Sequence, residues 1–155
     1  MAAPDAALRA QLLERTHWAD DFSYPEILRL AGYLQTRPFA KGAVVFREGE
    51  RDATLFVIAE GKVGIVKAGG SKRDLPIATL GVGATLGEMA LVDGLPRSAG
   101  AVALEQLVLL AITRQALDRL TTDHPQLAVK LVTKVAKLLS QRLRQTTNSL
   151  ADRLE

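Results

Sequence analysis

The chain has 155 residues, and 48 % of them are hydrophobic, which suits one domain with an ordinary core. It contains no cysteine, so disulfides, thiolate zinc sites and iron–sulfur clusters are excluded. The formal net charge is only +3, and no apolar run approaches the about 20 residues of a membrane-spanning helix. Residues 1–10 carry Asp5 and Arg9 and lack the apolar core of a signal peptide. We therefore expect a cytoplasmic protein without a membrane partner.

Two N-terminal segments, residues 6–15 and 25–34, place apolar side chains at helical intervals. Pro25 suits the first turn of the second helix, because its fixed φ is preorganised for that position. After Pro38 the spacing of the apolar residues changes. We therefore assign residues 1–37 to N-terminal helices.

The middle of the chain has the pattern of a β-protein. Short runs rich in branched residues occur at 44–46, 55–58, 63–66, 75–80 and 101–112. Turn-forming residues separate them, at 47–50, 60–61, 68–71 and 92–94. Many short strands at near-regular spacing are typical of a sandwich or barrel, which we place at residues 38–113.

The helical pattern returns at residues 114–120, and Pro125 then opens a long amphipathic segment. A helix that continued to residue 155 would be about 45 Å long, more than a small domain needs. The barrel, a ligand or a second copy of the chain must cover its apolar stripe. The stripe consists of Leu127, Leu131, Val135, Leu138, Leu139, Leu143, Leu150 and Leu154.

Basic residues crowd the same C-terminal part, at Lys130, Lys134, Lys137, Arg142 and Arg144. One interpretation is a surface that follows the phosphates of nucleic acid. The other is the solvated face of an amphipathic helix, which Lys130 and Lys134 favour because they fall opposite the leucines. We expect no nucleic-acid partner. With residues 114–155 as C-terminal helices, residues 1–155 form a single domain.

Residues 86–91 and 96–99 carry the chemistry of a binding site. A helix that begins near Gly87 has free N–H groups that attract an anion or a hydroxyl oxygen. Glu88 can accept a hydrogen bond from a ribose hydroxyl, and the planar fork of Arg97 suits two phosphate oxygens. Ser98 adds a hydroxyl, and Ala99 adds a backbone N–H. A surface turn with an ordinary Glu–Arg ion pair is the alternative, but the combined string favours a cyclic nucleotide.

Residues 86–99 resemble the phosphate-binding cassette of the cyclic-nucleotide-binding domain family. That family includes the catabolite activator protein, the regulatory subunits of cyclic-AMP-dependent kinase and the sensor domains of gated channels. The resemblance continues upstream at 46–50, at 55–58 with Gly61, and at Leu80 with Gly83, and covers about residues 27–143. It implies an eight-stranded jelly-roll β-barrel with flanking helices (α+β, mainly β) that holds cyclic AMP or cyclic GMP.

The resemblance also implies roles for single residues. Arg97 matches the arginine that neutralises the cyclic phosphate, and Glu88 matches the acid that holds the ribose 2′-hydroxyl. The backbone of Gly87, Met89 and Ala90 lies nearby, and Ser98 and Ala99 match further phosphate contacts. Ile65, Ile77 and Leu86 match apolar walls of the pocket, although core packing would explain these three equally well.

Two positions depart from the family pattern. Leu86 replaces the more usual aromatic residue or isoleucine. Gly100 stands where kinase-type domains often have a threonine that favours cyclic GMP in some members. Together with Ser98, which is typical of the activator-protein branch, this places cyclic AMP first and cyclic GMP second.

In the family the C-terminal helix closes over the base of the nucleotide. Here residues 142–148 interrupt the leucine stripe with polar groups. One interpretation gives Thr146 or Thr147 an adenine contact and Arg142 a stacking or lid role. The other is a solvated, fraying helix end. Candidate alignments differ by one helical turn, so both stay open.

No serine has an evident base partner, and His17 and His124 lie far apart without an acidic cluster, so we expect neither catalysis nor a bound metal or cofactor. The favoured function is a non-enzymatic sensor that signals through movement of its C-terminal helix, to a protein partner or in a homodimer formed through that helix. One alternative is a relative or fragment of a Crp-like transcription regulator, whose helix-turn-helix domain would follow the long helix. Another is a protein-interaction module with a degenerate pocket.

Overall fold

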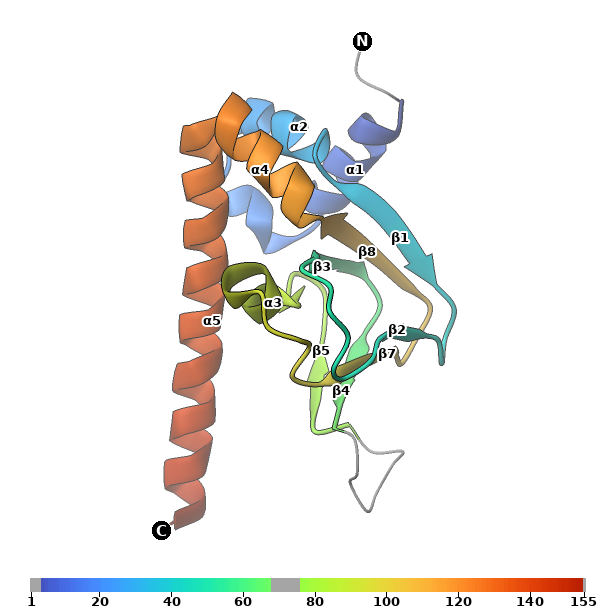
Figure 1. Cartoon of the computed structure of the whole chain (residues 1–155), viewed down its shortest axis with the longest axis vertical. Coiled ribbons are helices and arrows are strands. Elements are labelled where there is room, and N and C mark those ends of the chain that lie inside the picture. The colour runs from blue at the N-terminus through green and yellow to red at the C-terminus, as the bar shows by residue number, and fades with distance from the viewer. Residues whose placement is uncertain (1–3, 68–75, 155) are drawn as a thin grey trace.

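A computed structural model describes residues 4–67 and 76–154 (Figure 1). Helices at both ends of the chain flank two antiparallel sheets. The helices are α1 (Pro4–Glu14), the short 3-10 helix η1 (His17–Asp20), α2 (Tyr24–Ala31), α3 (Glu88–Asp93), α4 (Arg114–Asp123) and α5 (Pro125–Leu154). The strands are β1 (Gln35–Phe39), β2 (Val44–Phe46), β3 (Leu55–Glu60), β4 (Val63–Val66), β5 (Ala78–Leu80), β6 (Thr85–Leu86), β7 (Gly100–Ala103) and β8 (Leu107–Ile112). The predicted fold class is confirmed.

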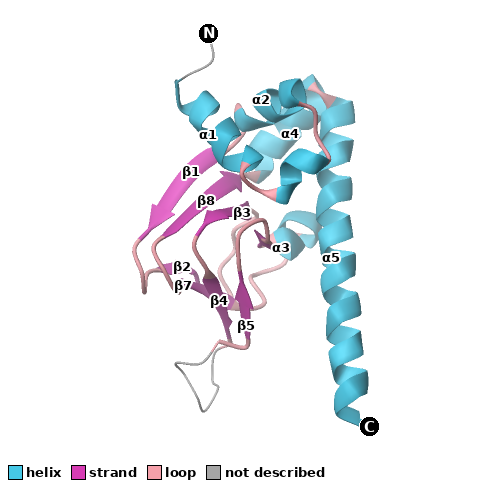
Figure 2. Ribbon diagram, turned by 180° about the vertical axis from the view of Figure 1, so that it is seen from behind, coloured by secondary structure: helices cyan, strands magenta, loops and turns pink. Residues whose placement is uncertain are grey.

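The two sheets each contain four strands, in the orders β1-β8-β3-β6 and β2-β7-β4-β5. Side chains alternate between the two faces of a strand, so β3 contributes to two cores. Leu55 and Val57 pack with the helices, whereas Phe56 and Ile58 pack inside the barrel. Figure 2 shows α1, α2 and α4 gathered at one end of the β-structure and α5 running along its side.

The limits of several elements differ from the sequence prediction. Strand β1 begins at Gln35, inside the segment that we expected to be helical, and Pro38 lies within it. This position is tolerated because β1 is an edge strand, where a missing N–H breaks no internal ladder. The run at 101–112 is two strands, β7 and β8, and the two-residue strand β6 was missed. Leu75 and the expected turn at 68–71 lie outside the described residues.

The second predicted N-terminal helix is found as α2, because its capping residues and its buried apolar residues favour a helix over the same segment. Ser23 accepts a hydrogen bond from the backbone N–H of Glu26, and the Glu26 carboxylate accepts one from the backbone N–H of Ser23, which forms a capping box. Pro25 lies in the first turn of α2, as expected. Ile27 and Leu30 on this helix are buried in the core that the helices share with β3 and β8.

Helix α5 is buried only in its first half. Leu127, Leu131 and Val135 are buried, whereas Leu143 and Leu150 are 68 % and 58 % exposed. Figures 1 and 2 show the last turns of α5 extending beyond every other element of the described chain. The sequence predicted one apolar stripe along the whole helix. In the structure, the apolar residues at the start of the helix pack into the core, and those near its end are exposed. No helix in the described part of the chain is long and apolar enough to cross a membrane.

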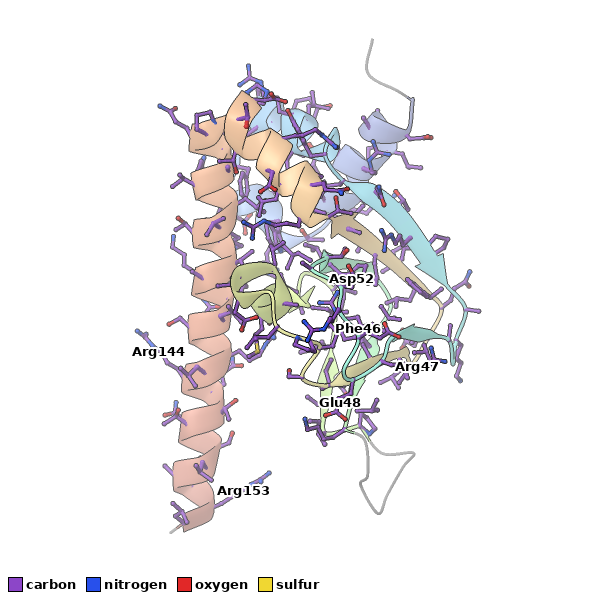
Figure 3. The ribbon with its side chains drawn as sticks, viewed as in Figure 1. Phe46, Arg47, Glu48, Asp52, Arg144 and Arg153 are labelled. Carbon is purple, nitrogen blue, oxygen red and sulfur yellow. The ribbon has the colours of Figure 1, made fainter. Side chains whose placement is uncertain are left out.

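The expected solvent face of α5 is found at Lys130 and Lys137, which are exposed, but is wrong for Lys134. The Lys134 ammonium bonds the Asp21 carboxylate at 2.5 Å, and the Lys134 side chain is only 11 % exposed. Lys130 bonds Glu26 at 2.8 Å. These lysines hold α5 against the N-terminal helices. Arg144, in contrast, is exposed and projects away from the body of the protein (Figure 3).

Candidate functional site

A cavity of about 270 Å³ lies at the wall of the barrel, close to the lower limit of about 300 Å³ for small-molecule sites. Strands β2, β4, β5 and β6, helix α3 and the segment that follows it form most of the wall, and α5 adds one residue. The cavity brings together ten of the residues singled out in the sequence: Ile65, Leu86, Gly87, Glu88, Met89, Ala90, Arg97, Ser98, Ala99 and Arg142. Segments far apart in the sequence therefore share one site.

Gly87 sets the geometry of this wall. It precedes α3 with φ +76°, in the left-handed region that favours glycine. A Cβ at this position would lie 2.1 Å from Nη1 of Arg97 and 2.6 Å from the carbonyl oxygen of Thr54. A side chain here would therefore displace the arginine as well as strain the backbone.

Arg97 is a buried cation with an incomplete set of partners. Its Nη1 donates to the carbonyl oxygen of Gly87 at 3.1 Å, and its Nη2 donates to that of Thr54 at 2.9 Å. The Asp52 carboxylate lies 3.6 Å from Nη2. Burial lowers the pKa of Arg97, and the charge of Asp52 acts in the opposite direction. Nε of Arg97 is buried and has no partner among the described residues.

Glu88 is a buried carboxylate that is only half satisfied. Its Oε1 accepts a hydrogen bond from Nη1 of Arg142 at 2.7 Å, whereas Oε2 is buried without a partner among the residues that the structure describes. Nη2 of Arg142 also donates to the carbonyl oxygen of Thr85 at 3.0 Å. The surface Glu–Arg turn considered as an alternative is not found, because Glu88 and Arg97 are both buried and pair with other residues.

Three predicted site residues do not line the cavity. Ile77 is 67 % exposed. Thr146 and Thr147 are exposed, and their hydroxyls donate to the carbonyl oxygens of Arg142 and Leu143 within their own helix, both at 2.9 Å. Of the polar segment 142–148, only Arg142 reaches the cavity wall in this structure.

Two important neighbours of Arg97 were missed by sequence reasoning. The ring of Phe46 lies under the guanidinium, 4.3 Å from Cζ to the ring centroid, and Asp52 supplies the nearest carboxylate. Figure 3 labels both residues, on β2 and on the loop that follows it. Phe46 belongs to the upstream segment that carries the family resemblance, but its strand pattern indicates only a core residue.

The arrangement can bind a small anion that also carries a hydroxyl. Arg97 offers positive charge and an unused N–H, and Glu88 offers an unused acceptor oxygen on the same cavity wall. A buried polar atom without a partner costs about 1–3 kcal/mol, so a ligand that supplies both partners is favoured. The apolar remainder of the wall, including Ile65, Leu80 and Leu86, suits a flat base.

Comparison with known proteins identifies the family of the chain. Residues 36–124 match the family model of the cyclic nucleotide-binding domain. The chain is 40 % identical to the cyclic AMP receptor protein of Thermus thermophilus over 78 % of this chain and 55 % of that protein. It is 32 % identical to a CRP-like cAMP-activated global transcriptional regulator of Mycobacterium tuberculosis, over 81 % of this chain and 54 % of that protein. The chain thus spans about half the length of these curated relatives.

Solved structures have the same fold. A cyclic nucleotide-binding domain from Methylobacillus flagellatus superposes with a TM-score of 0.81 at 28 % identity, covering 96 % of this chain and 83 % of that one. The Thermus thermophilus catabolite activator protein superposes with a TM-score of 0.66 at 34 % identity, covering 82 % and 58 %. The family model and these relatives show that this chain belongs to the cyclic nucleotide-binding domain family.

Proposed function

We propose that the chain is a cytoplasmic, non-enzymatic sensor that binds cyclic AMP, with cyclic GMP as second choice, and signals through its C-terminal helix. One observation carries this proposal: Arg97 and Glu88 are buried on one cavity wall, and each keeps a polar atom without a partner in the described part of the chain. The cyclic phosphate would take the free N–H of Arg97. The ribose 2′-hydroxyl would donate to the free oxygen of Glu88.

The choice of cyclic AMP rests on relatives and on two residues. The receptor protein and the regulator described above are named for cyclic AMP. Ser98 and Gly100 stand at the positions where the family resemblance favours cyclic AMP. Human cGMP-dependent protein kinase 2 is 29 % identical over 88 % of this chain, which keeps cyclic GMP as the alternative.

The proposed signal passes through Arg142. This residue of α5 donates to Glu88 and to the carbonyl oxygen of Thr85, so the helix is tied to the cavity wall. A ribose hydroxyl on Oε2 would share the Glu88 carboxylate with Arg142, which bonds Oε1, and this shared group would couple the ligand to α5. A ligand can shift the position of α5 only to the extent that it binds the two positions with different affinity.

A homodimer through α5 is the second part of the proposal. Val129, Val132, Leu143, Leu150 and Leu154 are each at least half exposed. Their spacings are built from the three- and four-residue steps of a heptad repeat. This face differs from the buried face of Leu127, Leu131 and Val135, so α5 can pack on its own domain and on a second copy at the same time.

Calorimetric titration with cyclic AMP, cyclic GMP and 2′-deoxy cyclic AMP tests the ligand. We expect micromolar affinity for cyclic AMP, about −8 kcal/mol, with weaker binding of the other two. No heat and no rise in melting temperature with any cyclic nucleotide would contradict the sensor. Sedimentation of Leu143→Gln and Leu150→Gln, with the exposed Gln145→Ala as control, tests the dimer, and a wild-type chain that stays monomeric with and without cyclic AMP would contradict it.

A further inference from the structure

Phe46 is the last residue of β2, and its ring faces the guanidinium of Arg97. The distance from Cζ of Arg97 to the ring centroid is 4.3 Å, well within the about 6 Å of a cation–π contact. Phe46 is only 7 % exposed and lines the cavity. Such a contact is stronger when both groups are removed from water, as they are here.

The ring holds Arg97 without using any of its donors. A guanidinium has five N–H groups in one plane. Carbonyl oxygens of Gly87 and Thr54 take one N–H each, and Asp52 lies beside Nη2. The guanidinium lies over the Phe46 ring face, a contact that occupies no N–H, and Nε has no partner among the described residues.

The position of the ring is itself fixed. Phe46 stacks on Phe56 with 6.1 Å between ring centroids and an interplanar angle of 22°. Phe56 is 2 % exposed, and Arg37 lies over its ring at 5.6 Å. Arg97 also lies over the Phe56 ring, at 5.9 Å from Cζ to the centroid, so the stacked aromatic pair packs against the guanidinium.

We propose that Phe46 is a positioning residue for ligand binding, whose ring face fixes the guanidinium plane of Arg97 for an anionic oxygen. The proposal rests on the proposed function, because it assigns to the same cavity a residue that acts through Arg97. It differs from a general core role in one respect: the electrons of the ring, and not only its volume, are required.

Stepwise fluorination of the ring separates these two roles, because fluorine withdraws charge from the ring face with little change of shape. We would replace Phe46 by mono-, di- and pentafluorophenylalanine and measure cyclic AMP affinity by calorimetry. Affinity is expected to fall with each step, to about tenfold weaker with five fluorines. The control is the same series at Phe39, which packs against the same cluster without an arginine over its ring in the described structure. Equal affinities across the Phe46 series would overturn the proposal while leaving the sensor function intact.

The Nε–Hε resonance of Arg97 in the free chain provides a test that needs no ligand. Ring current from Phe46 should shift this resonance, and stacking should slow rotation of the guanidinium. Both effects should disappear in Phe46→Leu and persist in Phe39→Leu. If the wild-type chain bound no cyclic nucleotide, the proposed function would fail and this measurement alone would decide whether Phe46 positions Arg97. An unchanged resonance in Phe46→Leu would show that it does not.

Discussion

Two nearly buried cations in this molecule have opposite environments. Lys134, at the base of α5, bonds the Asp21 carboxylate at 2.5 Å and lies over the ring of Trp18. Arg97, at the cavity, donates to two carbonyl oxygens, lies 3.6 Å from a carboxylate and keeps a buried N–H without a partner in the described structure. Burial alone therefore does not distinguish a structural cation from a binding one. The proposed phosphate role of Arg97 rests on its unused donor beside the cavity.

The two halves of α5 differ in the same way as the surroundings of Lys134 and Arg97. The first half packs into the core, and lysines pair it with the N-terminal helices. The second half contacts the rest of the protein through Arg142, at the cavity. Changes in the first half of α5 should therefore alter stability and spare binding, and changes at the cavity should weaken binding.

The largest expected effect is that of Arg97→Ala on affinity. The variant should lose about 2–5 kcal/mol of cyclic AMP binding, roughly 30-fold or more, because a buried phosphate would be left without its cation. Calorimetry gives the value, and Arg144→Ala, which removes an exposed arginine of α5, is the control. Equal affinities in the two variants would remove Arg97 from the phosphate role.

Gly87→Ala is a change at the cavity that should affect both stability and binding. A Cβ would lie 2.1 Å from Nη1 of Arg97, and alanine is strained at φ +76°. The variant should lose about 1–2 kcal/mol of stability from the backbone and also bind cyclic AMP at least tenfold more weakly. Gly94→Ala is the matched control, because Gly94 also has positive φ but a Cβ added there would meet no atom within 4 Å. Binding should be normal in that control, and the same loss of affinity there would show that strain alone is responsible.

Glu88→Gln should have a smaller effect on affinity. The amide keeps one acceptor oxygen but loses the charge that pairs with Arg142. We expect several-fold weaker binding of cyclic AMP and a reduced preference over the 2′-deoxy analogue, both measured by calorimetry. A variant that still discriminates fully between the two nucleotides would show that Glu88 does not bind the ribose 2′-hydroxyl.

Lys134→Met should affect only stability. Asp21 would lose its hydrogen-bonded partner, and the melting temperature should fall by a few degrees. Affinity for cyclic AMP, measured by calorimetry well below the melting temperature, should stay within twofold of wild type. A marked loss of affinity with little change in melting temperature would contradict the division between the two regions.

The smallest effect should be seen in the pH dependence of stability. The hydrogen bond from Lys134 lowers the pKa of Asp21, and that from Lys130 lowers the pKa of Glu26. Because both pKa values are lower in the folded state, the stabilisation is present above the ordinary carboxyl range, near pH 4, and is lost as the pH falls through the folded values. As the pH is lowered from 7 to 3, the melting temperature of a Lys130→Met, Lys134→Met double variant should fall less steeply than that of the wild type. The same fall in both proteins would mean that these ion pairs do not contribute to the pH dependence of stability.

The cavity could be predicted where its residues lie close together in the sequence. Gly87, Glu88 and Arg97 come from one short segment, and local chemistry is enough to relate them. Arg142 was expected near the ligand only from the resemblance, and its contact with Glu88 joins distant parts of the chain. Phe46 could not be found from the pattern, because a strand residue that packs in a core and one that supports an arginine look alike.

Helical periodicity was informative and also incomplete. It placed Leu127 and Leu131 correctly on the buried face of α5. It placed Lys134 in solvent, which is wrong. The periodicity of α5 shows which of its residues are apolar, but it cannot show that Trp18 and Asp21, from another part of the chain, cover the face of α5 that carries Lys134. The same limit applies to Thr146, one turn beyond Arg142, since a displacement of one turn decides whether a side chain meets the cavity.

The length of α5 has a mechanical consequence. The helix is continuous from Pro125 to Leu154 and is packed at its beginning. With a rise of about 1.5 Å per residue, Arg142 lies about 10.5 Å beyond Val135, the last buried residue of the helix, and Leu154 about 28.5 Å beyond it. A stiff helix that pivoted near Val135 would therefore enlarge a sideways step at Arg142 by about 2.7-fold at its tip. A spin label near residue 154 would report ligand arrival with greater sensitivity than one beside the cavity.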